Sequence, residues 1–165
     1  MKREKAVWLF AGGAMQEAAA EKVKDAGYKL ILTDMNPACH CGKYADEFVE
    51  KDTFDIDGNI EAAGDLKNKY EITGVFTAGA DCHETVAHVA KFLGLPGIDP
   101  EISRICRYKF LSREVLAKAG LPQPKFGSAK TFKEAQNVLL EIGFPAVIKS
   151  ANNSGTSCFC KLDGL

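Results

Sequence analysis

Two lysines and one loop of small residues could bind a phosphate group. Lys149 ends the short apolar run 144–148, and a polar, glycine-containing loop follows it. A strand can hold an ammonium group in place, and such a loop lets backbone N–H groups approach an anion closely. Lys109 begins a predicted helix, where a cation opposes the helix dipole unless an anion lies nearby. The candidate anion-binding residues are Lys109, Lys149, Ser154, Gly155, Thr156 and Ser157.

A second set of candidates follows predicted strands. Gly12 and Gly13 come directly after an apolar run, and Asp34 ends the next one. A dinucleotide-binding fingerprint would need a third glycine near residues 15–17, which read MQE, so a tight turn without a dinucleotide is favoured. Small ligands bind outside the carboxyl ends of parallel strands. The candidate substrate contacts are therefore Gly12, Gly13, Asp34 and Asp81, with Gly79 beside them.

The cysteines and histidines do not predict a metal site. The six cysteines include two C-x-C pairs, at 39–41 and 158–160, whereas zinc sites usually use C-x2-C or wider spacing. Free thiols are favoured over metal binding. His83 lies near a predicted strand end and could contact a ligand, although a structural role is favoured.

The first ninety residues alternate strand and helix patterns. Continuous apolar runs indicate strands buried on both faces, and short connections between strand and helix favour a parallel sheet with right-handed crossovers. We predict strands at 7–10, 28–33, 48–49 and 74–78, and helices at 14–26, 60–70 and about 81–93, the last opened by a capping box from Asp81 to Glu84. The predicted fold class is α/β, with a parallel, Rossmann-like sheet and flanking helices.

The pattern changes after residue 97. Asp99 and Pro100 are typical of the start of a short helix, and a further helix begins near Lys109 and ends before Gly120. A capping box at 131–134 opens a helix that we expect to turn Phe132, Ala135, Val138, Leu139 and Ile142 inward. Strands follow at 146–149 and 158–161. The predicted domains are residues 1–97 and 98–165.

Composition narrows the possible partners. The chain has 165 residues, 46% of them hydrophobic, which is enough for one domain with a core. Its formal net charge is −1, so it lacks the basic footprint of proteins that bind nucleic acid or a membrane surface. The apolar run 6–11 is too short for a signal-peptide core. We expect a cytoplasmic protein that binds neither nucleic acid nor membrane.

Four segments follow one another in the second half of the chain: 109–114 (KFLSRE), 119–124 (AGLPQP), 131–134 (TFKE) and 142–149 (IGFPAVIK). Their order resembles the beginning of an ATP-grasp domain, the fold of carbamoyl phosphate synthetase, biotin carboxylase and the purine-pathway ligases. The front half is similar to the domain that precedes the ATP-grasp domain in those enzymes. Its matching segments are 12–13 (GG), 34–37 (DMNP), 45–48 (ADEF) and 93–97 (LGLPG).

The resemblance implies roles and a reaction. Lys109 and Lys149 match the two basic positions that contact ATP phosphates, and residues 154–157 match the glycine-rich loop that closes over them. The implied reaction is an ATP-dependent carboxylate–amine ligation through an acyl phosphate, with Mg²⁺ and a small carboxylate substrate. Ser150 and Cys158 depart from the family pattern, which usually has proline and glycine there.

The same resemblance implies that the chain is the front part of a ligase. The carboxylates that hold Mg²⁺ and the strands that hold adenine are expected beyond residue 165, so no catalytic residue is assigned and the chain alone is expected to be inactive. A strand pair within 146–161 would lack sheet partners and would be mobile or would pair with a second copy, giving a homodimer. The alternatives are a non-catalytic module that binds a small ligand or a protein, and an NAD-dependent oxidoreductase.

Overall fold

The computed structural model describes residues 3–152 and 159–164. The chain divides into two compact units, and the division along the sequence falls between Ser103 and Arg104. The predicted domain boundary at residue 97 stays a prediction. Within the described ranges, no helix is long and apolar enough to span a membrane.

The first unit is built on a parallel sheet, which confirms the predicted α/β class. Four strands pair in the order β3-β2-β1-β4. In chain order the elements are β1 (Glu4–Phe10), η1 (Ala14–Gln16), α1 (Glu17–Asp25), β2 (Lys29–Asp34), η2 (His40–Tyr44), β3 (Glu47–Glu50), α2 (Ile56–Lys69), β4 (Tyr70–Thr77) and α3 (His83–Phe92). The register sets Phe10 opposite Thr33 and Thr77, so the carboxyl ends of β1, β2 and β4 lie at one edge.

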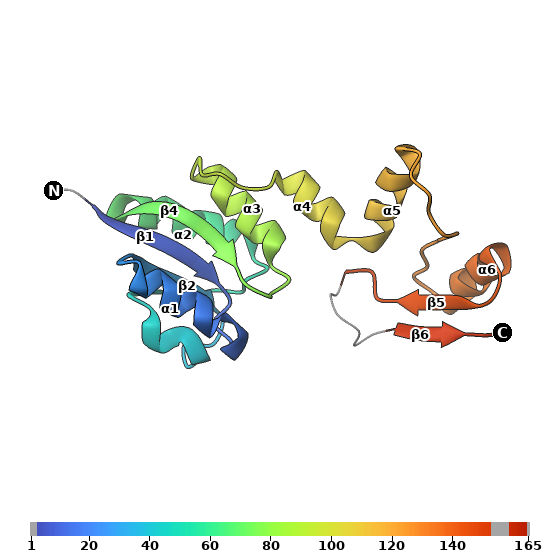
Figure 1. The fold of residues 1–165 in the computed structure, drawn as a ribbon, viewed down its shortest axis with the longest axis horizontal. Helices are drawn as coiled ribbons and strands as arrows, with labels where there is room; N and C mark the ends of the chain where they lie inside the picture. Colours follow the sequence, from blue (N-terminus) through green and yellow to red (C-terminus); the bar gives the residue numbers. More distant parts are fainter. Residues whose placement is uncertain (1–2, 153–158, 165) are drawn as a thin grey trace. The chain divides into compact units, whose positions relative to one another are not determined.

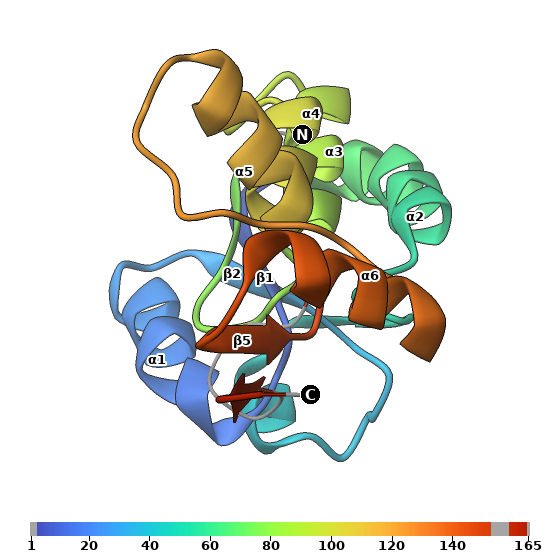
Figure 2. The same cartoon turned by 90° about the vertical axis from the view of Figure 1, so that its right-hand side faces the viewer.

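Helices cover both faces of this sheet, α1 on one side and α2 and α3 on the other (Figures 1 and 2). Trp8 and Phe10, which alternate along β1, are fully buried on the α2–α3 side, with ring centroids 5.3 Å apart. Leu9 and Leu32 are buried on the α1 side. Because successive side chains of a strand point to opposite faces, an unbroken apolar run is what a sheet covered twice requires.

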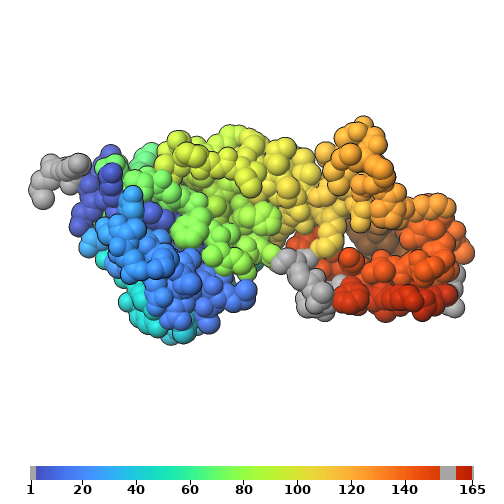
Figure 3. Space-filling view, viewed as in Figure 1, coloured from blue at the N-terminus to red at the C-terminus, as the bar shows by residue number. Residues whose placement is uncertain are grey.

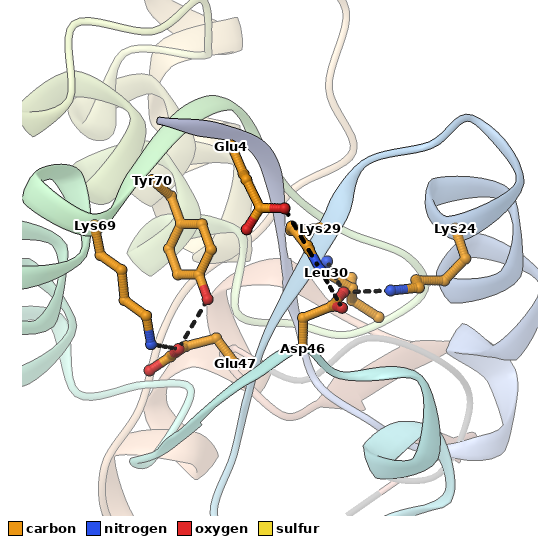
Figure 4. Close-up of polar contacts among 8 residues, drawn as sticks. All are labelled: Glu4, Lys24, Lys29, Leu30, Asp46, Glu47, Lys69 and Tyr70. Atoms are coloured by element: carbon orange, nitrogen blue, oxygen red, sulfur yellow. Dashed lines mark hydrogen bonds and ion pairs between the residues drawn. The ribbon is translucent and has the colours of Figure 1, made fainter. Parts of the chain in front are cut away.

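Ion pairs join the elements at the amino-terminal ends of the strands (Figure 4). The Asp46 carboxylate accepts hydrogen bonds from the Leu30 N–H at 2.8 Å, from Lys24, and from Lys29 Nζ at 3.3 Å. Glu47 is paired in the same way with Lys69 and with the Tyr70 hydroxyl, and Glu4 lies beside Lys29. This edge is therefore occupied by structural contacts, and any ligand site of the first unit is expected at the opposite edge.

The Asp46 contacts predict an acid-sensitive contribution to stability. Burial raises the pKa of Asp46, but hydrogen bonds from Lys24, the Leu30 N–H and Lys29 together lower it below its ordinary 3.8. Because the folded state has the lower pKa, this stabilisation is fully present above pH 3.8 and is lost as the pH falls below 3.8 through the lower pKa of the folded state. We expect Asp46→Asn to lower the free energy of unfolding by about 1 kcal/mol at pH 7 and by less at pH 3.

Urea titrations at the two pH values measure this difference. The matched control is Asp25→Asn, since the Asp25–Lys22 pair is exposed on both sides and should contribute nothing measurable. An Asp46→Asn effect of equal size at both pH values would show that the carboxylate charge is not the cause.

The second unit combines helices with a strand pair. The helix α4 (Pro100–Arg107) crosses the division between the units, and the elements after it are α5 (Lys109–Lys118), α6 (Phe132–Ile142), β5 (Ala146–Lys149) and β6 (Phe159–Leu162). The strands β5 and β6 are antiparallel. The predicted start of α6 is confirmed, because Thr131 Oγ1 accepts a hydrogen bond from the Glu134 N–H at 3.2 Å.

Two expectations about burial in this unit are wrong. Phe132 is 79% exposed instead of facing inward, although Leu139 of the same helix is buried. Val147 and Ile148 are 53% and 46% exposed, although their apolar run is typical of a buried strand. Among the described residues β5 pairs only with β6, so the sheet is too narrow to cover these side chains.

Candidate functional site

The turn after β1 and the end of β2 lie together at the carboxyl edge of the sheet. The Gly12 N–H donates a hydrogen bond of 2.8 Å to Asp34 Oδ2, and Asp34 Oδ1 accepts one of 2.9 Å from the Asn36 N–H. Ala11 begins the turn with a φ of 71°, in the left-handed region. Two of the predicted substrate contacts are thus neighbours because adjacent parallel strands end at the same edge.

Gly12 and Asp34 are hydrogen-bonded to each other, which weakens the case for dinucleotide binding. The donor that would face a pyrophosphate and the acidic group that would face a ribose are joined to one another. Gly12 is also buried, and a Cβ added to it would lie 2.4 Å from Cys39 Sγ. The glycine is therefore required by the packing of the loop after β2 rather than by a ligand.

Gly13 lies in the turn after β1, and two further candidates, Gly79 and Asp81, lie in the loop after β4. Gly79 has a φ of 74°, and Asp81 follows it. The predicted capping box at Asp81 is wrong, because the residue that caps α3 is Cys82 and it makes no side-chain cap bond. Sequence reasoning missed Gln16, which is buried and donates from Nε2 to the Ala78 carbonyl, joining the turn after β1 to this loop. A glutamine in a charged helix pattern gave no signal of that role.

Ionic contacts fix the segment 40–44 against α1. Glu17 accepts hydrogen bonds from Lys43 at 2.7 Å, from His40 Nε2 at 2.8 Å and from the Tyr44 hydroxyl at 3.0 Å. These contacts, that of Lys43 first, lower the pKa of Glu17 to about 2. Figure 3 shows α1 in blue and η2 in lighter blue side by side at the surface. These contacts therefore hold in place the segment 40–44, which neighbours the turn after β1.

A hollow of about 200 Å³ lies in the first unit away from the predicted site residues. It is lined by Lys91, Leu95, Gly97, Ile98, Asp99 and Pro100. Its single lysine is already paired with Asp99 at 3.1 Å. Nothing in this lining matches the chemistry that the sequence predicts.

In the second unit, the segments that carry the two candidate lysines are joined by a backbone contact. The Lys109 N–H, at the start of α5, donates a hydrogen bond of 3.1 Å to the carbonyl of Ala151, two residues after Lys149. Lys149 is exposed and Lys109 is half-buried. The other predicted phosphate contacts, at 154–157, lie outside the described residues.

The start of α5 is held by packing and by the chain before it. Ser112 Oγ donates a hydrogen bond of 2.6 Å to the Ile105 carbonyl, and the rings of Phe110 and Phe126 meet edge to face at 5.7 Å. Tyr108 is the N-cap and makes no side-chain cap bond, and the first turn holds no acidic residue. The first turn of α5 therefore carries no carboxylate that would compete with an anion bound at the amino end of the helix.

The described residues contain no group of three or more His, Cys, Asp or Glu side chains that could hold a metal ion. The cysteines among them are free thiols: Cys39, Cys41, Cys82, Cys106 and Cys160. His83 begins α3 and is partly buried, and no contact gives it a chemical role.

No protein-family model matches the chain. A protein of Sinorhizobium fredii named "Uncharacterized protein y4rH" is 40% identical over 110 residues, which make up 67% of this chain and 23% of that protein. The carbamoyl phosphate synthase large chain of Streptomyces coelicolor is 27% identical over 135 residues, or 79% of this chain and 12% of that one. The chain therefore spans less than a quarter of either relative.

Solved structures show a similar fold. An ADP complex of N5-carboxyaminoimidazole ribonucleotide synthetase matches with a TM-score of 0.74 and 17% identity, over 99% of this chain and 42% of that one. The biotin carboxylase domain of the Hydrogenobacter thermophilus 2-oxoglutarate carboxylase, in complex with MgADP, ADP and bicarbonate, matches with a TM-score of 0.61 and 20% identity. That match covers 94% of this chain and 36% of the other.

Proposed function

The chain resembles the amino-terminal portion of ATP-grasp superfamily enzymes in sequence and fold, and we propose that it forms this portion of a cytoplasmic, ATP-dependent carboxylate–amine ligase. In this proposal Lys109 and Lys149 bind ATP phosphates. The candidate residues 154–157, which lie outside the described residues, contribute to the same phosphate site in this proposal. The groups that complete catalysis, including the Mg²⁺ ligands, come from outside residues 1–165.

The observation that carries this proposal is the contact between Lys109 and Ala151. It brings the amino end of α5 to the chain that leaves Lys149. Two cations on joined segments suit a polyphosphate, whose charge is spread over several oxygens. Mg²⁺, when bound, would neutralise part of that charge. The lysines would orient the phosphates and stabilise charge that develops on them.

We further propose that the carboxyl edge of the first unit contributes to binding the small carboxylate substrate. Gly12 and Asp34 shape the turn through their own hydrogen bond. Gly13 and Asp81, the other two candidates, lie in the two loops that Gln16 joins. This division of roles refines the predicted set of substrate contacts.

Calorimetric titration with Mg-ATP at low salt tests the phosphate site. We expect weak binding by the chain and at least about a tenfold loss of affinity in Lys109→Ala and in Lys149→Ala. Lys118→Ala, in the last turn of α5, is the matched control and should bind as the unaltered chain does. Equal loss in all three variants would point to general charge attraction. Tight NAD binding without ATP binding would favour an oxidoreductase instead.

A further inference from the structure

Two thiols, Cys39 and Cys41, contact the two glycines of the turn after β1. Cys39 Sγ lies against Gly12, at 2.4 Å from where a Cβ would stand. Cys41 Sγ donates a hydrogen bond of 3.2 Å to the Gly13 carbonyl, and the Cys41 N–H donates one of 2.8 Å to the Gly12 carbonyl. The geometry of the turn therefore depends on both sulfur atoms.

We propose that Cys39 and Cys41 form a reversible thiol–disulfide site that takes small-molecule disulfides and controls the shape of the Gly12–Gly13 turn. Cys39 is partly exposed and Cys41 is fully buried, which assigns them different parts in the exchange. Residues two apart in the chain cannot have Cα atoms more than about 7 Å from each other, close to the upper limit for a disulfide. The proposal does not depend on the ATP site.

The exchange balances in two steps. The Cys39 thiol loses its proton to solvent, and its sulfur attacks the small disulfide, forming a mixed disulfide and releasing one small thiol. The Cys41 thiolate then attacks the Cys39 sulfur, which closes the S–S bond and releases the second small thiol. The cysteines are oxidised by two electrons, and the small disulfide is reduced by two. A disulfide in so small a ring is strained, so excess thiol should reverse it.

Closing this bond must alter the turn. At least one of the two sulfur atoms has to move from its position against Gly12 or Gly13, and Cys41 Sγ, without its proton, can no longer donate to the Gly13 carbonyl. The contacts of Glu17 with His40 and Lys43 hold the residues on either side of Cys41 in place, so the turn has to take up the change. Burial raises the pKa of both thiols. The exchange should therefore speed up about tenfold per pH unit near neutrality.

Incubation of the chain with oxidised glutathione at pH 8, followed by alkylation and trypsin, tests the proposal. Cleavage after Lys29 and Lys43 gives a peptide, 30–43, whose only cysteines are Cys39 and Cys41. We expect this peptide to lose two hydrogens and to regain two alkylatable thiols after dithiothreitol. In Cys41→Ser the peptide should instead retain one glutathione, whereas in Cys39→Ser it should stay unmodified over the same time.

Three results would overturn the proposal. In one, the peptide keeps both thiols free while exposed Cys106 becomes modified. In another, the unaltered chain accumulates the same mixed disulfide as Cys41→Ser, so that the ring does not close. In the third, the disulfide forms but the Cys41 amide exchanges hydrogen at an unchanged rate, which removes the link to the turn.

Discussion

Replacing Asn59 with alanine is expected to lower the free energy of unfolding by about 3 kcal/mol. Asn59 is fully buried, and its Nδ2 donates to the carbonyls of Asp52 at 2.9 Å and Asp55 at 2.7 Å. Its Oδ1 accepts from Thr33 Oγ1 at 3.4 Å. Alanine removes these three hydrogen bonds, and each such loss costs about 1 kcal/mol.

The same helix supplies the control. Asn68 also donates from Nδ2 to a carbonyl, that of Gly64 at 3.1 Å, but it is exposed. Asn68→Ala should change the free energy of unfolding by less than about 0.5 kcal/mol. Urea titrations followed by the fluorescence of Trp8, the only tryptophan, would measure both variants. Equal effects would mean that burial of the Asn59 network does not stabilise the fold.

Replacing Gly12 with alanine is expected to lower the free energy of unfolding by about 2 kcal/mol. The added Cβ would stand 2.4 Å from Cys39 Sγ and 3.3 Å from Leu32 Cδ2, so the loop after β2 must move. Gly64→Ala is the opposite case, since a Cβ on this helical glycine meets nothing within 4 Å. That change should stabilise the chain by about 0.5–1 kcal/mol.

A double substitution separates the contact from other effects of Gly12→Ala. Cys39→Ala removes the sulfur atom that the new Cβ would strike, so the two changes together should cost at least about 1 kcal/mol less than their sum. Thermal or urea unfolding of the four proteins gives this coupling. Simple additivity would show that Cys39 does not determine the requirement for glycine.

Helix boundaries show where sequence reasoning was sufficient and where it failed. The start of α6 follows from Thr131 and Glu134, which make a local contact that the sequence pattern predicts. The start of α2 was predicted at residue 60 but lies at Ile56, because Asp55 caps the helix by accepting from the Gly58 N–H at 3.0 Å. One glycine and two aspartates lie at the start of this helix, so the sequence pattern did not reveal where the helix begins.

The candidate site likewise has features that the sequence predicts and features that it does not. The strand ends at Gly12 and Asp34 were predictable from apolar runs, but the reason for the glycine is Cys39, which a sequence does not reveal as its neighbour. The hydrogen bond from Lys109 to Ala151 joins segments far apart in the chain. Only the resemblance to a family, not local pattern, suggested that these two segments act together.

Mapping Mg-ATP onto the isotope-labelled chain by amide chemical shifts tests the central claim most directly. We predict that the shifts concentrate at Lys109, Lys149 and Ala151, and that Lys149→Ala removes them while Lys118→Ala leaves them. Shifts confined to the turn at Gly12 and Gly13, or unaffected by Lys149→Ala, would contradict the proposed phosphate site.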